Sequence, residues 1–118
     1  MTDLKPDILR GEIWNVTLDP VIGSELRKTR PCVVVQRDAA NHRSPTTIVC
    51  PITSGSQADA NVLNVFVSAA SGIAHDSLVV CNQVRSIDKR RIVGHRVASL
   101  DAQTMSLIDK ALRAILDL

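Results

Sequence analysis

Short runs rich in apolar and β-branched residues recur along this chain between polar segments, which predicts short β-strands. In residues 11–18, Trp14 and Val16 alternate with polar residues, as expected for a half-buried strand. Two later runs, 32–36 and 46–52, are almost continuously apolar and are also predicted to be strands. Further strands are predicted at residues 62–68, 78–85 and 92–98, of which 78–85 is the longest and 92–98 is short.

From Leu100 the apolar spacing changes to about 3.6 residues, which predicts an amphipathic helix. Asp101 suits the N-cap of this helix, and Ser99 is the alternative. Many short strands followed by one helix predict a mainly β fold, a small barrel with a C-terminal helix. The apolar stripe of the helix consists of Met105, Ile108, Leu112 and Ile115.

Turn-forming residues predict the loops between the strands. Asp19-Pro20 opens a long surface loop that reaches Arg30, and residues 38–45 suit a single helical turn. Further loops are expected at 53–60 and 69–76. The sequence contains no repeat or linker, so its 118 residues fit one domain, 1–118, with residues 1–8 as an N-terminal tail.

Composition narrows the possible functions. Trp14 and Phe66 are the only aromatic residues, so base stacking on several aromatic side chains, as in RRM-like modules, is excluded. The net charge is only +2, but basic residues cluster at 27–30, 37–43 and 85–96, whereas acidic residues recur in the terminal helix. This asymmetry permits a basic groove on one face, although a solvated charged surface would give the same pattern.

Cysteine and histidine spacing gives no sign of a metal site. The three cysteines lie in apolar runs without Cys-x-x-Cys spacing and are expected to be buried thiols in a reducing compartment. The histidines share no ligand spacing and are expected at the surface, so no cofactor is predicted. No signal sequence or membrane-length apolar run is present, which predicts a cytoplasmic protein with no membrane partner. These residues are Cys32, Cys50, Cys81, His42, His75 and His95.

Two segments about twenty residues apart carry candidate chemistry: Arg30-Pro31 at the start of one apolar run, and Pro51-Ile52-Thr53 at the end of the next. Proline donates no backbone hydrogen bond, so it is expected at the start or edge of a strand. If the two strands pair antiparallel, Arg30 and Thr53 meet at one rim of the sheet. A guanidinium beside a hydroxyl is suited to holding a phosphate. Two capped strand ends with a solvated arginine would explain the same residues.

Short motifs follow one another along the chain. They are Arg10-Gly11-Glu12-Ile13-Trp14, Leu18-Asp19-Pro20, Gly23-Ser24-Glu25, Arg27-Lys28-Thr29-Arg30-Pro31, Ser44-Pro45-Thr46-Thr47-Ile48-Val49, Pro51-Ile52-Thr53-Ser54, Asp76-Ser77 and Gln83-Val84-Arg85-Ser86-Ile87-Asp88-Lys89. In this order, over residues 9–118, the chain resembles the MazF/PemK (Kid-like) toxins, sequence-selective ribonucleases of toxin–antitoxin pairs. The resemblance implies an SH3-like barrel of the CcdB/MazF kind that forms a homodimer.

The resemblance also implies a metal-independent endoribonuclease that cuts single-stranded RNA to a 2′,3′-cyclic phosphate and a 5′-hydroxyl. Arg30 and Thr53 match the family's catalytic arginine and threonine. Because arginine is a poor proton donor at neutral pH, Arg30 is expected mainly to neutralise the phosphorane, with proton delivery to the leaving oxygen secondary. Thr53 is expected to donate its hydroxyl, and also its backbone N–H, to a non-bridging oxygen. A hydroxyl that caps a turn is the alternative for Thr53.

The general base is less evident. Glu25 in the long loop is the candidate, although a loop glutamate near Arg27 also suits a solvated ion pair. The Kid/PemK branch carries an Arg and an Asp in the segment that matches 78–85. This chain has Val80 and Asn82 at those positions, so a mechanism with that Asp as the base does not carry over.

RNA contacts are expected along the strand ends and in the loops 19–27 and 54–60, which would flank the groove. Asn82 and Gln83 could read a base edge, since amides pair well with adenine, or could simply be polar residues at a strand end. Arg85 suits a phosphate contact. The expected RNA-binding residues are Ser24, Arg27, Lys28, Thr29, Ser54, Asn82, Gln83 and Arg85.

Two other functions stay open. One is a non-enzymatic poison that binds gyrase, as CcdB does, although CcdB ends in Trp-Gly-Ile and this chain ends in Leu116-Asp117-Leu118. The other is a degenerate toxin that acts only as a DNA-binding co-repressor. The expected partners are single-stranded RNA (mRNA, rRNA or tRNA), the C-terminal segment of an antitoxin, a second copy of the chain, and operator DNA only together with the antitoxin.

Overall fold

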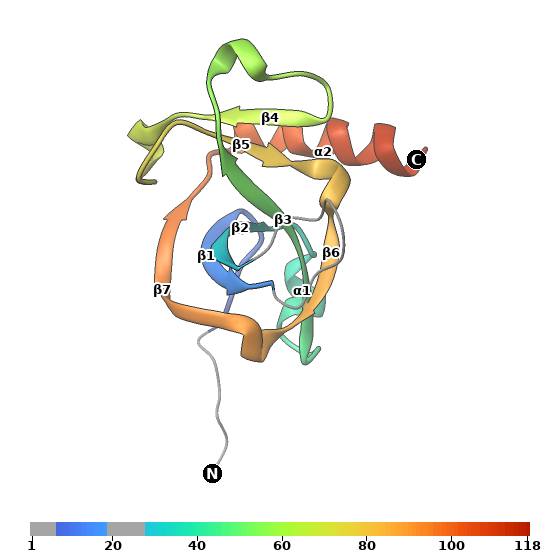
Figure 1. The fold of residues 1–118 in the computed structure, drawn as a ribbon. Coiled ribbons are helices and arrows are strands. Elements are labelled where there is room, and N and C mark those ends of the chain that lie inside the picture. The colour runs from blue at the N-terminus through green and yellow to red at the C-terminus, as the bar shows by residue number, and fades with distance from the viewer. Residues whose placement is uncertain (1–6, 19–27) are drawn as a thin grey trace.

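The computed structural model describes residues 7–18 and 28–118. Within them the chain forms seven strands, two α-helices and four short 3₁₀ turns (Figure 1). The strands are β1 (Glu12–Thr17), β2 (Thr29–Val34), β3 (Thr46–Ser54), β4 (Asn64–Val67), β5 (Ser77–Val80), β6 (Arg85–Asp88) and β7 (Ile92–Ser99). The helical elements are α1 (Asp38–Asn41), α2 (Ala102–Leu116), η1 (Gln57–Asp59), η2 (Ala69–Ser71), η3 (Cys81–Gln83) and η4 (Lys89–Arg91).

All strand pairs are antiparallel, and the strands curl into a barrel-like sheet with α2 behind β4 and β5 (Figure 1). Strand order is β4-β5-β3-β2-β1-β7, and β6 also pairs with β3. The long strand β3 therefore belongs to both halves of the sheet. The predicted mainly β fold with a C-terminal helix is confirmed. The two apolar runs pair antiparallel, which is the condition under which Arg30 and Thr53 were expected to meet.

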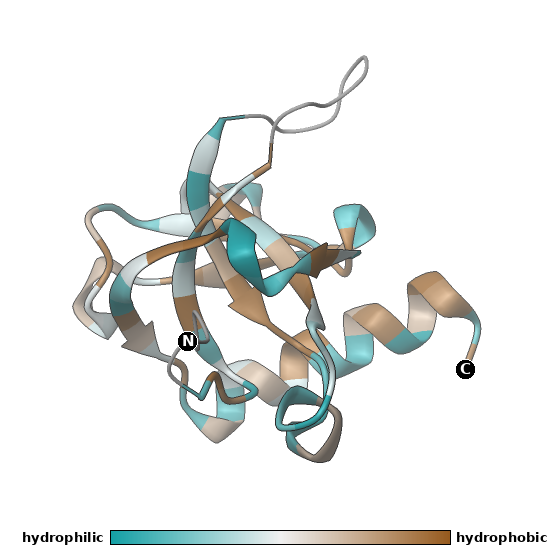
Figure 2. Cartoon of the chain, turned by 90° about the horizontal axis from the view of Figure 1, so that it is seen from below, coloured by the Kyte–Doolittle hydropathy of each residue, from teal (hydrophilic) through white to brown (hydrophobic). Residues whose placement is uncertain are grey.

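The two continuously apolar strands are buried on both faces. Successive residues of a strand point to opposite faces, so a strand covered on both sides needs no polar alternation. In β2, Val33 packs in a core cluster beneath α2, whereas Cys32 and Val34 pack in a second cluster inside the barrel. Figure 2 shows apolar residues along the strands in the middle of the molecule.

The terminal helix begins where the sequence predicts. The Asp101 side chain accepts a hydrogen bond from the Thr104 N–H at 2.8 Å, and this bond lowers the pKa of the Asp101 carboxyl. Ser99, the other candidate cap, is instead the last residue of β7. The buried face of α2 carries Met105, Ile108 and Ala111, while Leu112 and Ile115 are partly buried at its edge.

The predicted long strand 78–85 is wrong, because the chain breaks into β5, η3 and β6. Both strands pair with the same edge of β3, with Ile52 opposite Val79 and Val49 opposite Arg85. Between these two pairs, β3 advances by three residues (49 to 52), whereas the partner segment advances by six (79 to 85). The turn η3 takes up the extra residues. The longest strand is β3, with nine residues.

Other predicted boundaries shift by a few residues. Strand β2 begins at Thr29 rather than after Pro31, and β3 runs to Ser54, so both prolines lie inside strands. The strand predicted at 62–68 is shorter, and the strand predicted to be short, β7, has eight residues. The loops expected at 53–60 and 69–76 contain η1 and η2. No helix in the described part of the chain is long and apolar enough to cross a bilayer.

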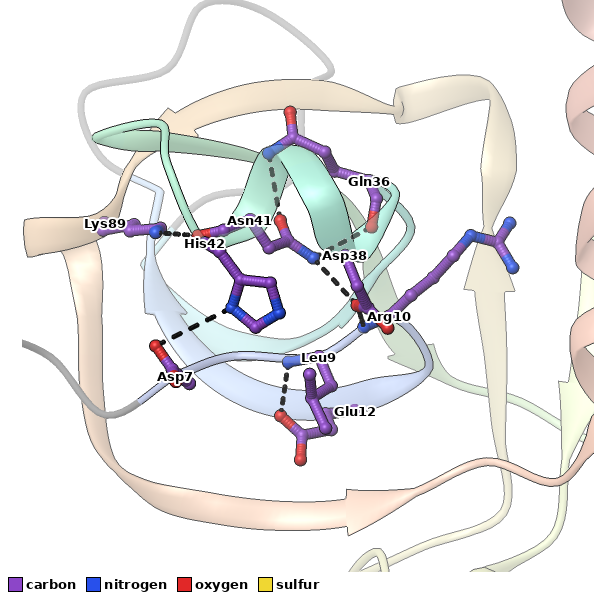
Figure 3. Close-up of polar contacts among 9 residues, drawn as sticks. All are labelled: Asp7, Leu9, Arg10, Glu12, Gln36, Asp38, Asn41, His42 and Lys89. Atoms are coloured by element: carbon purple, nitrogen blue, oxygen red, sulfur yellow. Dashed lines mark hydrogen bonds and ion pairs between the residues drawn. The ribbon is translucent and has the colours of Figure 1, made fainter.

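The N-terminal end of the described chain packs on the barrel. Ile8 is only 1% exposed and belongs to the cluster inside the barrel, although the tail predicted from the sequence included it. Asp7 lies 4.0 Å from His42 at the end of α1 (Figure 3). The folded part of the chain therefore begins no later than Ile8.

The predicted helical turn at 38–45 forms as α1 and is held by a buried polar network around Asn41 (Figure 3). The Asn41 side chain is 1% exposed; its amide donates to the Gln36 carbonyl, and its oxygen accepts from Gln36 Nε2 at 2.9 Å and from the Thr47 hydroxyl at 2.7 Å. Lys89 donates to the Asn41 carbonyl. The network ties α1 to β3 and to the start of η4.

Candidate functional site: a cavity where β2, β3 and β5 meet

Proline at position 31 leaves a carbonyl of β3 without its ladder partner. The Val35 N–H donates to the Ile48 carbonyl, so the carbonyls of residues 48, 50 and 52 face β2. The same two-residue repeat would bring the N–H of residue 31 to the Ile52 carbonyl, but proline has no N–H. The Arg30 guanidinium donates to that carbonyl instead, with Nη1 3.3 Å from the oxygen.

The Arg-Pro and Pro-Ile-Thr motifs are therefore parts of one local arrangement. Cys32 pairs with Pro51, and continuing this register by two residues sets Arg30 opposite Thr53. Both side chains are half-buried and stand on the same face of the two strands, because each lies two residues from that pair. The predicted meeting of Arg30 and Thr53 at one rim is confirmed.

Proline at position 51 is tolerated inside β3 because the backbone of this residue faces an edge of β3 where no strand pairs with it. Since the even-numbered carbonyls of β3 face β2, residue 51 faces the other edge. On that edge β6 pairs only as far as Val49 and β5 pairs only from Ile52 onward. The missing N–H of Pro51 therefore breaks no ladder hydrogen bond.

A cavity of about 340 Å³, which we call the rim cavity, lies at this place. It collects the predicted site residues Arg30, Thr53 and Ser54 from β2 and β3, together with residues from the segment that enters β5. The residues that line it are Arg30, Pro31, Ile52, Thr53, Ser54, Ile73, Ala74, His75 and Ser77. A guanidinium, several hydroxyls and an imidazole thus border a space large enough for a phosphate group.

Gly55 lets β3 approach β5 closely beside the rim cavity. A Cβ at this position would lie 2.6 Å from Cδ1 of Leu78, closer than real Cβ contacts. The Gly55 N–H donates to the Asp76 carbonyl, and the Ser77 hydroxyl donates to the His75 carbonyl at 2.7 Å. These contacts fix the segment that carries His75 against the end of β3.

One part of the prediction for Thr53 is wrong. Thr53 pairs with Leu78 of β5, so its backbone N–H points toward β5 and belongs to the hydrogen-bond ladder of the sheet. The N–H is therefore not directed at the rim cavity, and the hydroxyl is the donor that Thr53 offers there.

Three predicted RNA-binding residues, Lys28, Thr29 and Arg85, gather around the end of β1. The Leu18 N–H donates to the Lys28 carbonyl, and Arg85 Nη1 donates to the Leu18 carbonyl at 3.4 Å. The hydroxyl oxygens of Thr29 and Thr17 lie 3.1 Å apart and share a hydrogen bond. These residues adjoin the β2 side of the site without lining the rim cavity.

The polar residues Asn82 and Gln83 lie on η3 rather than at a strand end, and they do not line the rim cavity. Asn82 is exposed and Gln83 is half-buried. Of the other predicted residues, Ser24, Glu25 and Arg27 lie outside the residues that the structure describes.

The cysteines are free, buried thiols, as predicted. Burial raises the pKa of Cys32 to about 12, while the nearby charges of Arg30 and Arg85 oppose this shift. A hydrogen bond with Cys81 and burial both raise the pKa of Cys50. Cys32 and Cys50 are therefore protonated packing groups rather than nucleophiles.

The histidines are exposed, as predicted, and within residues 7–18 and 28–118 no three His, Cys, Asp or Glu side chains gather as metal ligands. His75 is nevertheless a residue that the sequence reasoning missed as part of the site. The one available signal was its position directly before the Asp76-Ser77 motif.

Comparisons with known proteins identify the family of this chain. Residues 9–116 match the family model for the PemK-like, MazF-like toxin of type II toxin–antitoxin systems. The chain is 37% identical over 112 residues to endoribonuclease EndoA of Bacillus subtilis, covering 94% of this chain and 96% of EndoA. It is 36% identical over 113 residues to endoribonuclease PemK of Escherichia coli, covering 95% and 84%.

Solved structures share the fold. MazF of Deinococcus radiodurans superposes with a TM-score of 0.83 at 22% identity, covering 97% of this chain and all of that one. A MazE–MazF complex from the same organism gives a TM-score of 0.76 at 19% identity, covering 97% and 99%. With the family model spanning nearly the whole sequence and two relatives above 30% identity, this chain belongs to the PemK-like, MazF-like toxin family of type II toxin–antitoxin systems.

Proposed function

We propose that this chain is a metal-independent endoribonuclease that cleaves single-stranded RNA selectively and is inhibited by a cognate antitoxin. The observation that carries the proposal is the position of Arg30 and Thr53 at one cavity, in a chain whose relatives are named endoribonucleases. Those names favour RNA cleavage over the gyrase-binding and co-repressor alternatives. We expect the protein to act in the cytoplasm.

RNA carries its own nucleophile, the 2′-hydroxyl beside each phosphate. Its attack on phosphorus forms a phosphorane whose added negative charge must be stabilised. Arg30 supplies a positively charged, planar donor, and Thr53 supplies a hydroxyl. Both side chains stand on paired strands, so the donors require little reorganisation when RNA binds.

Cleavage of a long RNA should proceed in EDTA and leave a 2′,3′-cyclic phosphate and a 5′-hydroxyl. The reason is that the nucleophile is internal to the RNA and the phosphorane is neutralised by Arg30. The measurement is a map of the new 5′ ends, combined with their labelling by polynucleotide kinase without prior dephosphorylation. Strict dependence on Mg²⁺, or ends that carry a 5′-phosphate, would contradict this mechanism.

RNA flanking the scissile phosphate is proposed to run from the rim cavity over neighbouring strand ends. Lys28, Thr29, Ser54 and Arg85 would hold its backbone, which positions the strand without reading sequence. Asn82 and Gln83 would read base edges through their amides. Ser24, Arg27 and the candidate base Glu25 complete the proposed set.

We also propose that the active form is a homodimer, neutralised by the extended C-terminal segment of an antitoxin. Solved structures with this fold include MazE–MazF complexes and an endoribonuclease with its cognate antitoxin, which supports such a partner. An acidic, apolar-studded segment would order as it binds and would cover the site residues. Operator DNA is proposed as a partner only of the toxin together with its antitoxin.

The purified protein should be a dimer by size-exclusion chromatography with light scattering. Co-expression with the adjacent small reading frame should give a complex without ribonuclease activity. Added salt should weaken this complex, because acidic side chains of the antitoxin would occupy the places of the RNA phosphates and salt screens such charge pairs. A monomer that cleaves RNA at the full rate, or an antitoxin that binds and leaves cleavage intact, would contradict this proposal.

A further inference from the structure

The residues predicted from the sequence leave one chemical task at the rim cavity without a suitable group. The 5′-oxygen is a poor leaving group unless it receives a proton as its bond to phosphorus breaks. A guanidinium stays protonated at any pH near neutrality and transfers protons poorly, and a threonine hydroxyl is a far weaker acid than an imidazolium. Arg30 and Thr53 therefore stabilise charge but do not move a proton efficiently.

Among the residues that the structure describes, His75 is the other titratable residue that lines the rim cavity. Strands β2 and β5 pair with opposite edges of β3, so Arg30 reaches the cavity from one neighbour of β3 and His75 from the segment that enters the other. Histidine is the side chain best able to exchange a proton between pH 5 and 8. A phosphate held by Arg30 and Thr53 would thus have an imidazole on its β5 side.

Hydrogen bonds hold the backbone that carries His75. The carbonyl of His75 accepts the Ser77 hydroxyl, and the next residue, Asp76, accepts the Gly55 N–H through its carbonyl and the Ala69 N–H through its side chain at 2.8 Å. The imidazole itself is exposed, so RNA can reach it.

A bound phosphate would make the surroundings of His75 suitable for a proton donor. Among the described residues that line the cavity, Arg30 is the other charged one, and its positive charge opposes that of an imidazolium. The Asp76 carboxylate is engaged by the Ala69 N–H. Bound RNA brings the negative charge of the phosphate next to the imidazole, and an opposite charge within a few ångströms favours the protonated form. An imidazole in contact with the bound phosphate would thus be placed to give a proton rather than to take one.

We propose that His75 is the general acid of RNA cleavage, an inference that rests on the proposed endoribonuclease function. The 2′-oxygen forms a bond to phosphorus, and its proton passes through a base to solvent. The bond from phosphorus to the 5′-oxygen breaks, the bonding electron pair stays on that oxygen, and the oxygen takes the imidazolium proton. The neutral imidazole then regains a proton from water.

The first test is the pH dependence of cleavage by the intact protein, its His75→Gln variant and the matched His95→Gln variant, which changes an exposed histidine of β7 outside the cavity. Loss of a general acid costs about 10²-fold in rate. For the intact protein we expect kcat to fall between about pH 6 and 8. We expect His75→Gln to lose both that fall and about the stated factor in rate. His95→Gln should behave like the intact protein. A kcat that rises with pH through a His75-dependent step would overturn the proposal.

The second test separates proton donation from mere positive charge or folding. With an oligonucleotide whose leaving 5′-oxygen is replaced by sulfur, the leaving thiolate needs no proton, so His75→Gln should cleave it at the rate of the intact protein. His75→Lys keeps a cation but should stay impaired on ordinary RNA. A defect that persists on the sulfur substrate, or full activity of His75→Lys on ordinary RNA, would overturn the assignment. Failure of the intact protein to cleave either substrate would instead refute the proposed function.

Discussion

The Arg30→Ala variant should cleave RNA about 10²–10³-fold more slowly than the intact protein, the loss expected when one transition-state donor is removed. The guanidinium is the permanent positive charge at the rim cavity and is held there by its 3.3 Å hydrogen bond to the Ile52 carbonyl. Most of the loss should appear in kcat, because the phosphorane carries more charge than the bound phosphate. The measurement is single-turnover cleavage of a short RNA that contains the preferred site.

Controls distinguish this effect from a general change in charge. Arg43→Ala removes an exposed arginine outside the rim cavity and should leave kcat nearly unchanged. Thr53→Ala should cost less than Arg30→Ala, because it removes a neutral donor rather than a charged one. Full activity of Arg30→Ala, or loss of its folded state, would argue against the catalytic assignment.

The Asn41→Ala variant should lower the free energy of unfolding by about 2–3 kcal/mol, because it removes a buried amide and leaves the groups that it satisfies without partners. The Thr47 hydroxyl, on a residue with 0% exposure, would lose its 2.7 Å hydrogen bond to Asn41 Oδ1. The Gln36 carbonyl would lose the amide donor. Urea denaturation with the midpoint and slope fitted separately measures the change.

A second substitution tests whether the cost comes from the stranded hydroxyl. Thr47→Val removes that hydroxyl with little change in shape, so adding it to Asn41→Ala should cost less than Thr47→Val costs alone. Asn82→Ala, at an exposed asparagine of η3, should stay within about 0.5 kcal/mol of the intact protein. Strictly additive effects of the two network substitutions would contradict this account of Asn41.

Much of the site could be predicted because its two main residues lie at the ends of strands that follow each other in the sequence. An antiparallel pair brings such ends together whatever the rest of the fold does, so the sequence alone was enough to assign Arg30 and Thr53 to one place. His75 could not be found this way. It lies more than twenty residues beyond Thr53 and reaches the cavity only because β5 pairs with the end of β3.

The break at η3 illustrates the opposite case. An apolar run such as 78–85 has the same pattern whether it forms one strand or two, since burial on both faces removes the alternation that marks a strand's limits. Only the pairing of β5 and β6 with a single edge of β3 requires the turn between them. Asn82 and Gln83 therefore lie on that turn and not at a strand end.

The sequence by itself determined the local features of this protein. Apolar runs indicated most of the strands, the 3.6-residue spacing and Asp101 indicated α2, and the motif order indicated the toxin family. These signals are local because each depends on one strand face, one helix face or one turn. The tertiary structure decided which strands share β3, that the Ile52 carbonyl turns to Arg30 because residue 31 has no N–H, and that His75 joins the same cavity. Such outcomes depend on the register between distant segments, which only packing around a common core can set.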